Sequence, residues 1–390
     1  MAREPFDLVL NGAYYELFIS ACAALGVLIL MLTRILMPTR KQITLSAIIV
    51  LTLAVGVFAQ KKDDKKQTDE QKRDIQAVVK LVDDMAAGQP APNDFNVTWA
   101  HEDFLKAQGN KQYAPFAVTL DATKTTAGTV AFYWRAVSKD AAPPPPPSAP
   151  DSKDKDKKDD KKSPKRPEYA YEDVSFVPVT GQQNGPIRIQ RSLTVPTGVY
   201  DVYVAVKEPT SSQKNAPPSK ASVIKQTLNV PDFWNGELNT SSVIVAQRIE
   251  PLATPLTTQQ QIERPYALSG LEIVPVVEMK MSKKNELQTF MIIYNPKIDS
   301  ANKPDVIVEY SFFTKSGGTE KFFNKTSPQS LNAQTLPPQF DVTAGHQLQA
   351  GQGVPLTSFP EGDYRLEIKV TDKLANKSLT RDVNFTVSGS

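Results

Sequence analysis

Two histidines are the first side chains of this sequence that could do acid–base or metal chemistry. His101 lies in TWAHEDF beside Glu102 and Asp103, and His346 lies in AGHQL, in the other half of the chain. An imidazole acts as a general base or metal ligand only when acids or further ligands converge on it. The adjacent acids are sequence neighbours only, and no spacing singles out distant partners. We therefore interpret both histidines as structural or surface residues.

Adjacent aromatic residues in PDFWNGE (231–237) provide a second kind of candidate site. If Phe233 and Trp234 are exposed, they could stack on a sugar or on a partner protein. If they are buried, they would fill the joint between two domains. We favour joint packing, and keep a glycan-binding alternative that uses Trp234 or Trp99.

Common catalytic and cofactor motifs do not occur in the sequence. It contains no G-x-S-x-G, no phosphate loop that ends in Lys-Ser/Thr, no H-E-x-x-H and no EF-hand loop. The single cysteine, Cys22, excludes a disulfide within one chain and a multi-cysteine zinc site. No pair of carboxylates stands out for glycoside hydrolysis. We predict a protein that is not an enzyme, with no cofactor and no metal.

The charge balance gives no argument for a nucleic-acid partner. The chain has 45 basic and 42 acidic residues, a net charge of +3. A nucleic-acid-binding domain usually has a strong basic excess on one face. We expect no nucleic acid, and a partner that is a protein or an envelope polysaccharide.

The N-terminus contains two apolar runs, 17–32 and 43–59, separated by a basic stretch. In one interpretation, translation starts at Met37 and residues 37–59 are a signal peptide. Residues 1–36 would then be an upstream hydrophobic extension. In the alternative, both runs are short transmembrane helices with the basic loop in the cytoplasm.

The signal-peptide interpretation is favoured because small residues precede a plausible cleavage point between Ala59 and Gln60. Both interpretations place residue 60 onward outside the cytoplasm. The predicted location is the periplasm, the outer surface or the medium. An uncleaved segment would anchor the protein in the membrane.

Residues 60–91 are predicted to be a charged linker followed by a short helix. In DIQAVVKLVDDMAAG, apolar residues such as Val78 and Val82 recur at helical spacing, and Gly88 supplies a stop. The helix could bind a partner or lie near the membrane. We favour a helix that docks on the first domain or serves as a spacer.

A low-complexity segment, 139–167, contains five consecutive prolines followed by interleaved lysines and aspartates. Such a composition cannot bury apolar surface. It could bind a polyanionic envelope surface, but opposite charges largely cancel, which favours a solvated loop. Residue patterns typical of β-strands occur on both sides of the segment, which indicates an insertion within a domain.

The rest of the chain predicts an all-β fold. Short runs rich in Val, Tyr, Phe and Thr alternate with turn residues from 92 to 230, and again from 231 to 390. This pattern is typical of antiparallel sandwiches. We predict two tandem immunoglobulin-like β-sandwiches, with these boundaries, behind an N-terminal export or membrane segment.

One motif, P-x-G-x-Y followed by strict alternation, occurs near the end of each predicted sandwich. Its residues are Pro196, Gly198, Tyr200, Pro360, Gly362 and Tyr364. The glycines fit a corner that needs positive φ, and the tyrosines fit a tyrosine corner. In each copy the tyrosine and every second residue after it should face the core, with the intervening residues outward. A closing strand follows each copy, so we interpret the motif as part of a repeated fold.

Three stretches carry a resemblance to known proteins: 232–252, 271–296 and 359–387. They resemble an uncharacterised family of exported bacterial proteins, and they look like the C-terminal sandwich regions attached to von Willebrand A-like or GWxTD-type proteins. The resemblance implies an extracytoplasmic β-sandwich protein without assigned catalysis. The D-x-S-x-S and GWxTD motifs do not occur, so no site residue is carried over.

From these observations we expect a non-catalytic exported protein that binds or has a structural role at the bacterial cell envelope. One alternative is a glycan-binding or glycan-active protein. The other is a membrane-anchored assembly or secretion accessory that retains residues 1–59.

Overall fold

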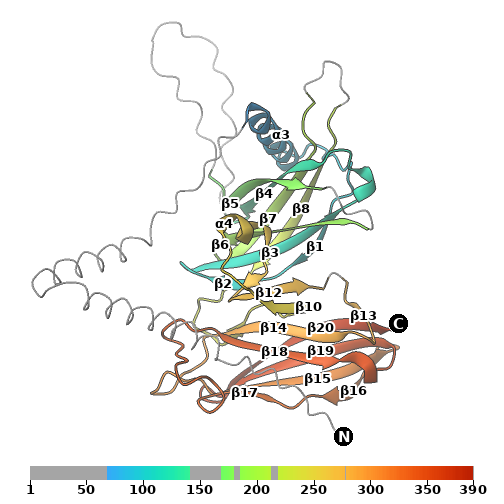
Figure 1. Ribbon diagram of the computed structural model, residues 1–390. Coiled ribbons are helices and arrows are strands. Elements are labelled where there is room, and N and C mark those ends of the chain that lie inside the picture. Colours follow the sequence, from blue (N-terminus) through green and yellow to red (C-terminus); the bar gives the residue numbers. More distant parts are fainter. Residues whose placement is uncertain (1–67, 141–167, 180–184, 212–217, 277, 390) are drawn as a thin grey trace, which may run out of the picture. The chain divides into compact units, whose positions relative to one another are not determined.

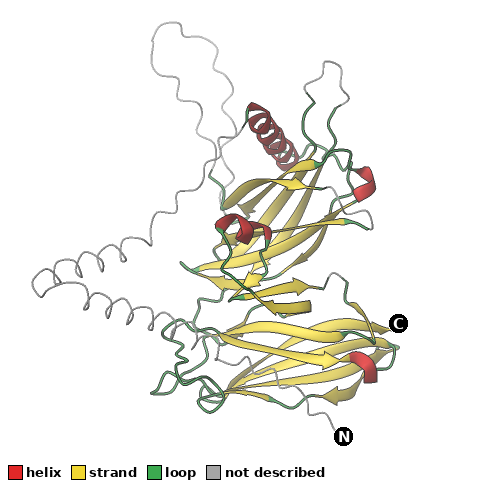
Figure 2. Ribbon diagram, viewed as in Figure 1, coloured by secondary structure: helices red, strands yellow, loops and turns green. Residues whose placement is uncertain are grey.

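The computed structural model describes residues 68–140, 168–179, 185–211, 218–276 and 278–389. Strands dominate this part of the chain, and only two α-helices occur in it (Figure 2). The prediction of an all-β fold is confirmed. The apolar runs before residue 60, the proposed Ala59–Gln60 cleavage point and most of the 139–167 insertion lie outside the described residues.

The strands of the first half, in chain order, are β1 (Thr98–Glu102), β2 (Leu105–Ala107), β3 (Lys111–Leu120), β4 (Thr129–Ser138), β5 (Tyr171–Pro178), β6 (Ile187–Val195), β7 (Gly198–Lys207) and β8 (Ala221–Val230). The strands of the second half are β9 (Asn239–Thr240), β10 (Ile244–Pro251), β11 (Ala267–Leu268), β12 (Leu271–Pro275), β13 (Lys280–Ser282), β14 (Glu286–Tyr294), β15 (Val306–Ser316), β16 (Thr319–Lys325), β17 (Gln329–Leu331), β18 (Leu348–Pro355), β19 (Gly362–Asp372) and β20 (Lys377–Ser388). The helices are α3 (Asp69–Ala86) and α4 (Thr258–Glu263), with short 3-10 turns at Ala122–Lys124 and Leu356–Ser358.

Two sheets make up the first sheet pair (Figure 1). One sheet has the order β5-β4-β7-β8, and in the other β3 pairs with β1 and β2 on one side and with β6 on the other. Apolar side chains from both sheets share one core, which includes Phe116, Phe132 and Trp134. The alternation of apolar residues along these strands places one face of each sheet in that core.

Helix α3 covers the outer face of the β5-β4-β7-β8 sheet (Figure 1). Thr68 caps its first turn, and Gly88 follows its end at φ +85°. Val78 and Val82 are fully buried against this face, which includes Tyr133 and Ala205. The helix therefore packs on the first sheet pair, one of the two arrangements favoured from the sequence.

The helix also corrects the expected exposure of strand β7. Asp201, Tyr203 and Lys207 were expected to face outward as polar positions, but Tyr203 and Lys207 are buried. Their pattern differs because α3 covers the outer face, and Lys207 forms an ion pair of 3.2 Å with Asp74 of the helix. Strand β7 is thus buried on both faces along most of its length.

The second sheet pair encloses a separate core. One sheet has the order β11-β12-β10-β14-β18, with β9 also paired to β14, and the other has the order β13-β20-β19-β15-β16, with β17 also paired to β15. Buried side chains of β14 and β18 meet those of β15, β19 and β20, among them Tyr310, Phe312 and Phe385. This sheet pair also closes with a long hairpin, β19–β20.

The two P-x-G-x-Y motifs have the same geometry. The hydroxyl of Tyr200 donates to the Pro196 carbonyl at 3.1 Å, and that of Tyr364 donates to the Pro360 carbonyl at 2.8 Å. Gly198 and Gly362 have φ values of +147° and +144°, which L side chains rarely adopt. Each tyrosine pairs across the hairpin with a buried residue of the closing strand, Leu228 or Phe385. Each motif is thus a tightly bonded corner of its sheet.

Candidate functional site

The contact region between the two sheet pairs is the most elaborate feature of the described residues. We call its apolar part the joint cluster, which contains Leu105, Phe233, Ile244, Ala246, Tyr266, Leu271, Ile273, Phe290, Ile292 and Tyr294. Phe104 and Tyr113 of the first sheet pair pack against it. The outer face of the β10–β14 sheet is therefore covered by apolar residues of strands β2 and β3.

Hydrogen bonds fasten the same region. The backbone of Phe104 exchanges two bonds of 2.9 Å with Ser242, through the Ser242 N–H and the Ser242 hydroxyl. The Lys106 N–H donates to the Tyr294 hydroxyl at 3.0 Å, and the Tyr113 hydroxyl donates to the Pro265 carbonyl at 2.8 Å. Such bonds satisfy polar groups that the apolar contact removes from water. The joint therefore combines apolar packing with directional bonds.

The two aromatic residues named from the sequence have different environments. Phe233 is 2 % exposed, and its ring centroid lies 5.0 Å from that of Tyr294 in the joint cluster. Trp234 is 41 % exposed, with its indole N–H bonded to the Lys111 carbonyl at 3.0 Å. The Lys106 ammonium lies 4.1 Å from the Trp234 ring centroid, close enough for a cation–π interaction. Phe233 packs in the joint, and Trp234 lies at its margin.

Trp99, the other aromatic of the glycan-binding alternative, is engaged within the first sheet pair. Its ring stacks on Phe116 with centroids 4.7 Å apart, and its indole N–H donates to Glu102 at 2.6 Å. One face of the Trp99 ring is therefore occupied by the protein itself.

A polar triad at the joint includes one of the two histidines. His101 Nε2 and Asp103 Oδ2 are 2.6 Å apart, and the hydroxyl of Tyr266 donates to the same oxygen at 2.8 Å. Asp103 is 2 % exposed and lies in the first sheet pair, whereas Tyr266 precedes β11 of the second. Asp103 is therefore a bonded partner of His101, which corrects the interpretation of this acid as a mere sequence neighbour.

The surroundings of His101 shift its protonation. Burial alone lowers the pKa of the imidazole, but the hydrogen bond and charge of Asp103, with the charge of Glu102, outweigh it and raise the pKa above 6.5. Arg188 opposes this rise through its own charge. Burial and Asp103 also raise the pKa of the Tyr266 hydroxyl, which keeps it a hydrogen-bond donor. The triad is suited to holding two segments together.

His346, the other histidine, lies in the second sheet pair and is exposed. Its Nδ1 accepts a bond of 2.9 Å from the Asp341 backbone N–H within its own loop. The structure does not bring His346 and His101 together in one site. Across the described ranges, no group of three His, Cys, Asp or Glu residues is arranged to hold a metal ion.

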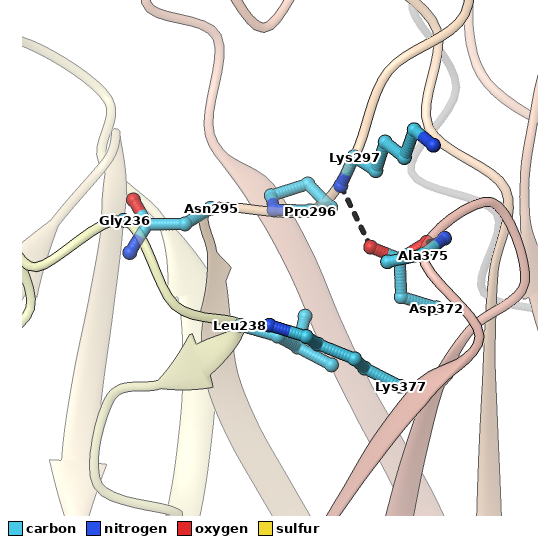
Figure 3. Close-up of a pocket in the computed structure, with 8 residues that line it drawn as sticks. All are labelled: Gly236, Leu238, Asn295, Pro296, Lys297, Asp372, Ala375 and Lys377. Atoms are coloured by element: carbon cyan, nitrogen blue, oxygen red, sulfur yellow. Dashed lines mark hydrogen bonds between the residues drawn. The ribbon is translucent and has the colours of Figure 1, made fainter.

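A cleft of about 350 Å³ lies in the second sheet pair beside the joint (Figure 3). Buried Asp372 accepts from the Lys297 N–H at 2.7 Å and from the Ala375 N–H at 3.0 Å, so both of its oxygens support loop backbone. Asn295 donates to two carbonyls of the 231–237 segment, and Lys377 pairs with Glu237. Because these polar groups already bond one another, we interpret the cleft as a structural junction.

Sequence reasoning missed Tyr266, Lys106 and Arg188 as parts of the joint. Tyr266 and Asp103 are 163 positions apart, and no local pattern joins them. The adjacency of His101 and Asp103 was the one signal available, since residues two apart in a strand point to the same face. A bulge between Trp99 and His101 shows that even this register is locally irregular.

Comparisons with known proteins add little to this description. No protein-family model and no curated protein matches the sequence. Among solved structures, the chain is similar to Escherichia coli alpha-2-macroglobulin activated by porcine elastase, at 10 % identity and a TM-score of 0.21, covering 72 % of this chain and 24 % of that one. It is also similar to the native conformation of that protein, at 10 % identity and a TM-score of 0.18, over 77 % and 15 % of the two chains.

A third structure, trypsin-activated alpha-2-macroglobulin from Escherichia coli, gives 9 % identity and a TM-score of 0.19 over 76 % of this chain and 16 % of that one. This chain thus spans less than a quarter of the length of these proteins. At such TM-scores the similarity carries no argument about function. The class that the fold defines is a mainly β protein of packed, largely antiparallel sheets, with one parallel pair between β13 and β20. Among its described residues, no helix is long and apolar enough to cross a membrane.

Proposed function

We propose that this chain is a non-catalytic scaffold or binding protein of the bacterial cell envelope, in which two immunoglobulin-like sandwiches are held at a fixed angle. The observation that carries the proposal is the joint. A joint with both apolar packing and directional bonds fixes how the two sandwiches present their loops. Fixed loops on a rigid support are the usual arrangement of a binding surface.

The repeated corner supports the tandem part of the proposal. Tyr200 and Tyr364 bond back to prolines at the same distance along the chain, and each heads the last hairpin of its sheet pair. Immunoglobulin-like sandwiches use such a tyrosine to close the corner before a late strand. A duplication of one sandwich would explain why both copies share it.

The apolar runs at 17–32 and 43–59 support a location outside the cytoplasm, in the periplasm, on the outer surface or in the medium. Sequencing the N-terminus of the mature protein tests this. A chain that begins at Gln60 supports the signal-peptide form. A chain that keeps residues 1–59 supports a membrane-anchored assembly or secretion accessory instead.

The scaffold proposal is tested by opening the joint. A photo-reactive residue at Phe322, which is 60 % exposed, would be placed in the full chain and in a Phe233→Ala variant, and cross-linked in the envelope fraction. We expect the full chain to form discrete cross-linked adducts with its partner, and the Phe233→Ala variant, in which the joint is loosened, to lose them. Turnover on a hydrolase panel that vanishes on mutating a single acidic residue would contradict the non-catalytic assignment.

A glycan-binding protein is the second candidate, because Trp234 keeps 41 % of its surface exposed beside the Lys106 ammonium. An aromatic ring next to a cation suits an acidic sugar. A glycan array with the parent chain and with Trp234→Ala tests it. Equal signals from the two proteins, or no signal, would exclude this candidate.

A further inference from the structure

Strand β16 is a free edge of the second sheet pair. It spans Thr319–Lys325 and pairs only with β15 among the described strands, so it is the last strand of its sheet (Figure 1). A terminal strand turns every second backbone N–H and C=O away from its neighbour, where another strand can pair with them. The edge of β16 is therefore a surface that a further strand can extend.

The two-residue loop before β16, residues 317–318, shows which backbone groups are free. Its two glycines have φ values of +58° and +79°, which fits a type I′ turn closed by a backbone bond between Ser316 and Thr319. From this closing pair onward, bonded and non-bonded residue pairs alternate along the two strands. Glu320 and Phe322 take the non-bonded positions, so their N–H and C=O groups point away from β15.

An exposed aromatic side chain lies at the same edge. Phe322 is 60 % exposed, and its ring meets that of Phe313 edge-on, with the two centroids 5.9 Å apart. Phe313 is itself covered by the Arg365 guanidinium, which lies 4.5 Å from its ring centroid. Phe323, the next residue along β16, lies at a bulge and packs on Tyr364, with ring centroids 5.5 Å apart. Of the two phenylalanines of β16, the fold covers one and leaves the other in solvent.

Two lysines of β16 lack an acidic partner. Glu320, the one acid of the strand, already pairs with Lys315 at 3.5 Å and with Arg365 at 3.0 Å. Within the described ranges, no carboxylate oxygen lies within 4.0 Å of the ammonium of Lys321 or of Lys325. Cross-strand pairing places Lys325 on the outer face of the sheet and Lys321 on the other face. An added strand would therefore meet one free ammonium on each of its faces.

A second copy of β16 does not suit this edge. Two antiparallel copies would bring four free lysines together, and the Glu320 of each copy is already held by its own arginine. Like charges on neighbouring strands are destabilising, and lysines on edge strands are a common protection against pairing between copies. An acidic strand would instead neutralise both lysines, and an apolar side chain on its outer face would cover Phe322.

We propose that an acidic β-strand of a partner protein adds to β16, pairs with the backbone of Glu320 and Phe322, and sets an apolar side chain against the Phe322 ring. In this mode of recognition, main-chain bonds at the sheet edge give affinity and alternate side chains give selectivity. The inference rests on the proposed binding role and names the chemistry of the partner. It needs only the second sheet pair, so it can fail while the scaffold proposal, which is tested at the joint, holds.

The probe is a blocked, fluorescently labelled peptide in which valine and glutamate alternate, with a valine–lysine peptide as its charge-reversed control. Each is titrated into the full chain in detergent, and binding is followed by fluorescence anisotropy. We expect saturable binding of the valine–glutamate peptide only, and weaker binding as the salt concentration rises. At saturation, amide hydrogen exchange at Glu320 and Phe322 should slow by at least about tenfold, because a bonded amide exchanges only when its strand detaches. Exchange at Lys321, whose N–H already faces β15, should change less.

Variants separate the aromatic contact from the charge. Phe322→Thr keeps a good strand former and loses the ring, so the peptide should bind about three- to fivefold more weakly. The double variant Lys321→Glu with Lys325→Glu should weaken binding by about tenfold or more. The matched control is Lys284→Glu with Lys369→Glu, because both lysines are exposed and lie outside β16. This control carries the same change of net charge and should leave peptide affinity unchanged.

Three results would overturn the proposal. The first is that the valine–glutamate peptide does not saturate the folded parent chain, or saturates it without slowing exchange at Phe322. The second is equal binding of the valine–lysine peptide, which indicates an edge that does not select acidic strands. The third is protection of Phe322 that rises with protein concentration without peptide, together with a dimer in sedimentation, which assigns the edge to a second copy of this chain. Envelope adducts that are lost in Phe233→Ala, beside any of these results, would show that only this inference fails.

Discussion

Truncation of Tyr364 tests whether the second corner motif locks the fold. The side chain is 1 % exposed, and its ring centroid lies within 5.5 Å of those of Phe323, Phe359 and Phe385. Removing a buried aromatic side chain costs about 3–5 kcal/mol of stability. Removing the hydroxyl alone, in Tyr364→Phe, breaks one bond of 2.8 Å to the Pro360 carbonyl and costs about 1 kcal/mol.

Urea denaturation followed by circular dichroism measures both changes. With a slope of about 2 kcal/mol per molar urea, the midpoint should fall by about 2 M in Tyr364→Ala and by about 0.5 M in Tyr364→Phe. Phe322→Ala, at a position 60 % exposed in the same sheet pair, should change stability by less than about 0.5 kcal/mol. An unchanged midpoint in Tyr364→Ala would refute the lock. Equal losses of stability in Tyr364→Ala and Tyr364→Phe would refute the conclusion that ring packing contributes more stability than the hydroxyl bond.

Three further predictions concern the helix, the triad and the joint. Val82→Ala should lower the free energy of unfolding by about 2 kcal/mol and increase amide hydrogen exchange across α3, because Val82 is fully buried between the helix and the sheet. Unchanged exchange would contradict the docking of α3 on the sheet. Because the pKa of His101 is raised in the folded chain, protonation of His101 stabilises the fold fully below pH 6.5, and this stability is lost as the pH rises through the raised pKa. The urea midpoint of the parent chain should therefore fall with rising pH, and that of Asp103→Asn should change less. Identical pH profiles of the two proteins would refute the coupling between His101 and Asp103. In calorimetry, Phe233→Ala should cost about 3–5 kcal/mol and Trp234→Ala about 1 kcal/mol, and the reverse order would show that the joint depends on the exposed ring.

Local pattern was enough to predict the face that strand β19 buries. Tyr364, Leu366, Ile368 and Val370 alternate with polar residues, and all four are at most 1 % exposed. The reason is that alternation in a strand assigns side chains to two faces without reference to the rest of the chain. The glycine of the corner was equally visible, since a turn at positive φ needs it.

The candidate site could not be read in the same way, because its members come from distant segments. Asp103 and Tyr266 meet only when the two sheet pairs pack. No short stretch of the sequence shows which segments of the two sheet pairs will come into contact. Joint packing was predicted for both Phe233 and Trp234; Trp234 keeps 41 % of its surface exposed at the margin, and only Phe233 is buried in the joint. Its partner Tyr294 could not be named, since β14 offers several aromatic and aliphatic residues on the same face.

Buried cations on strands provide a signal that sequence reasoning left unused. Arg135 lies within the apolar run of β4, has a side chain 2 % exposed, and pairs with Asp83 of α3 at 2.6 Å. Lys207 on β7 pairs with Asp74 of the same helix. A buried charge is stable only with a partner, so a cation inside an apolar strand predicts that another element brings an acid to it.

The same rule separates strand β6 from its neighbours. Arg191 takes one of the buried positions of β6 and Arg188 lies on the opposite face of the strand, yet within the described ranges neither forms an ion pair with a carboxylate. On the outer face of β4 and β7 the fold supplies the acids from α3. On β6 the Nε and Nη2 donors of Arg188 have no hydrogen-bond partner, and Arg191 bonds the neutral Ser175 hydroxyl and Gln190 carbonyl, so this strand departs from the rule.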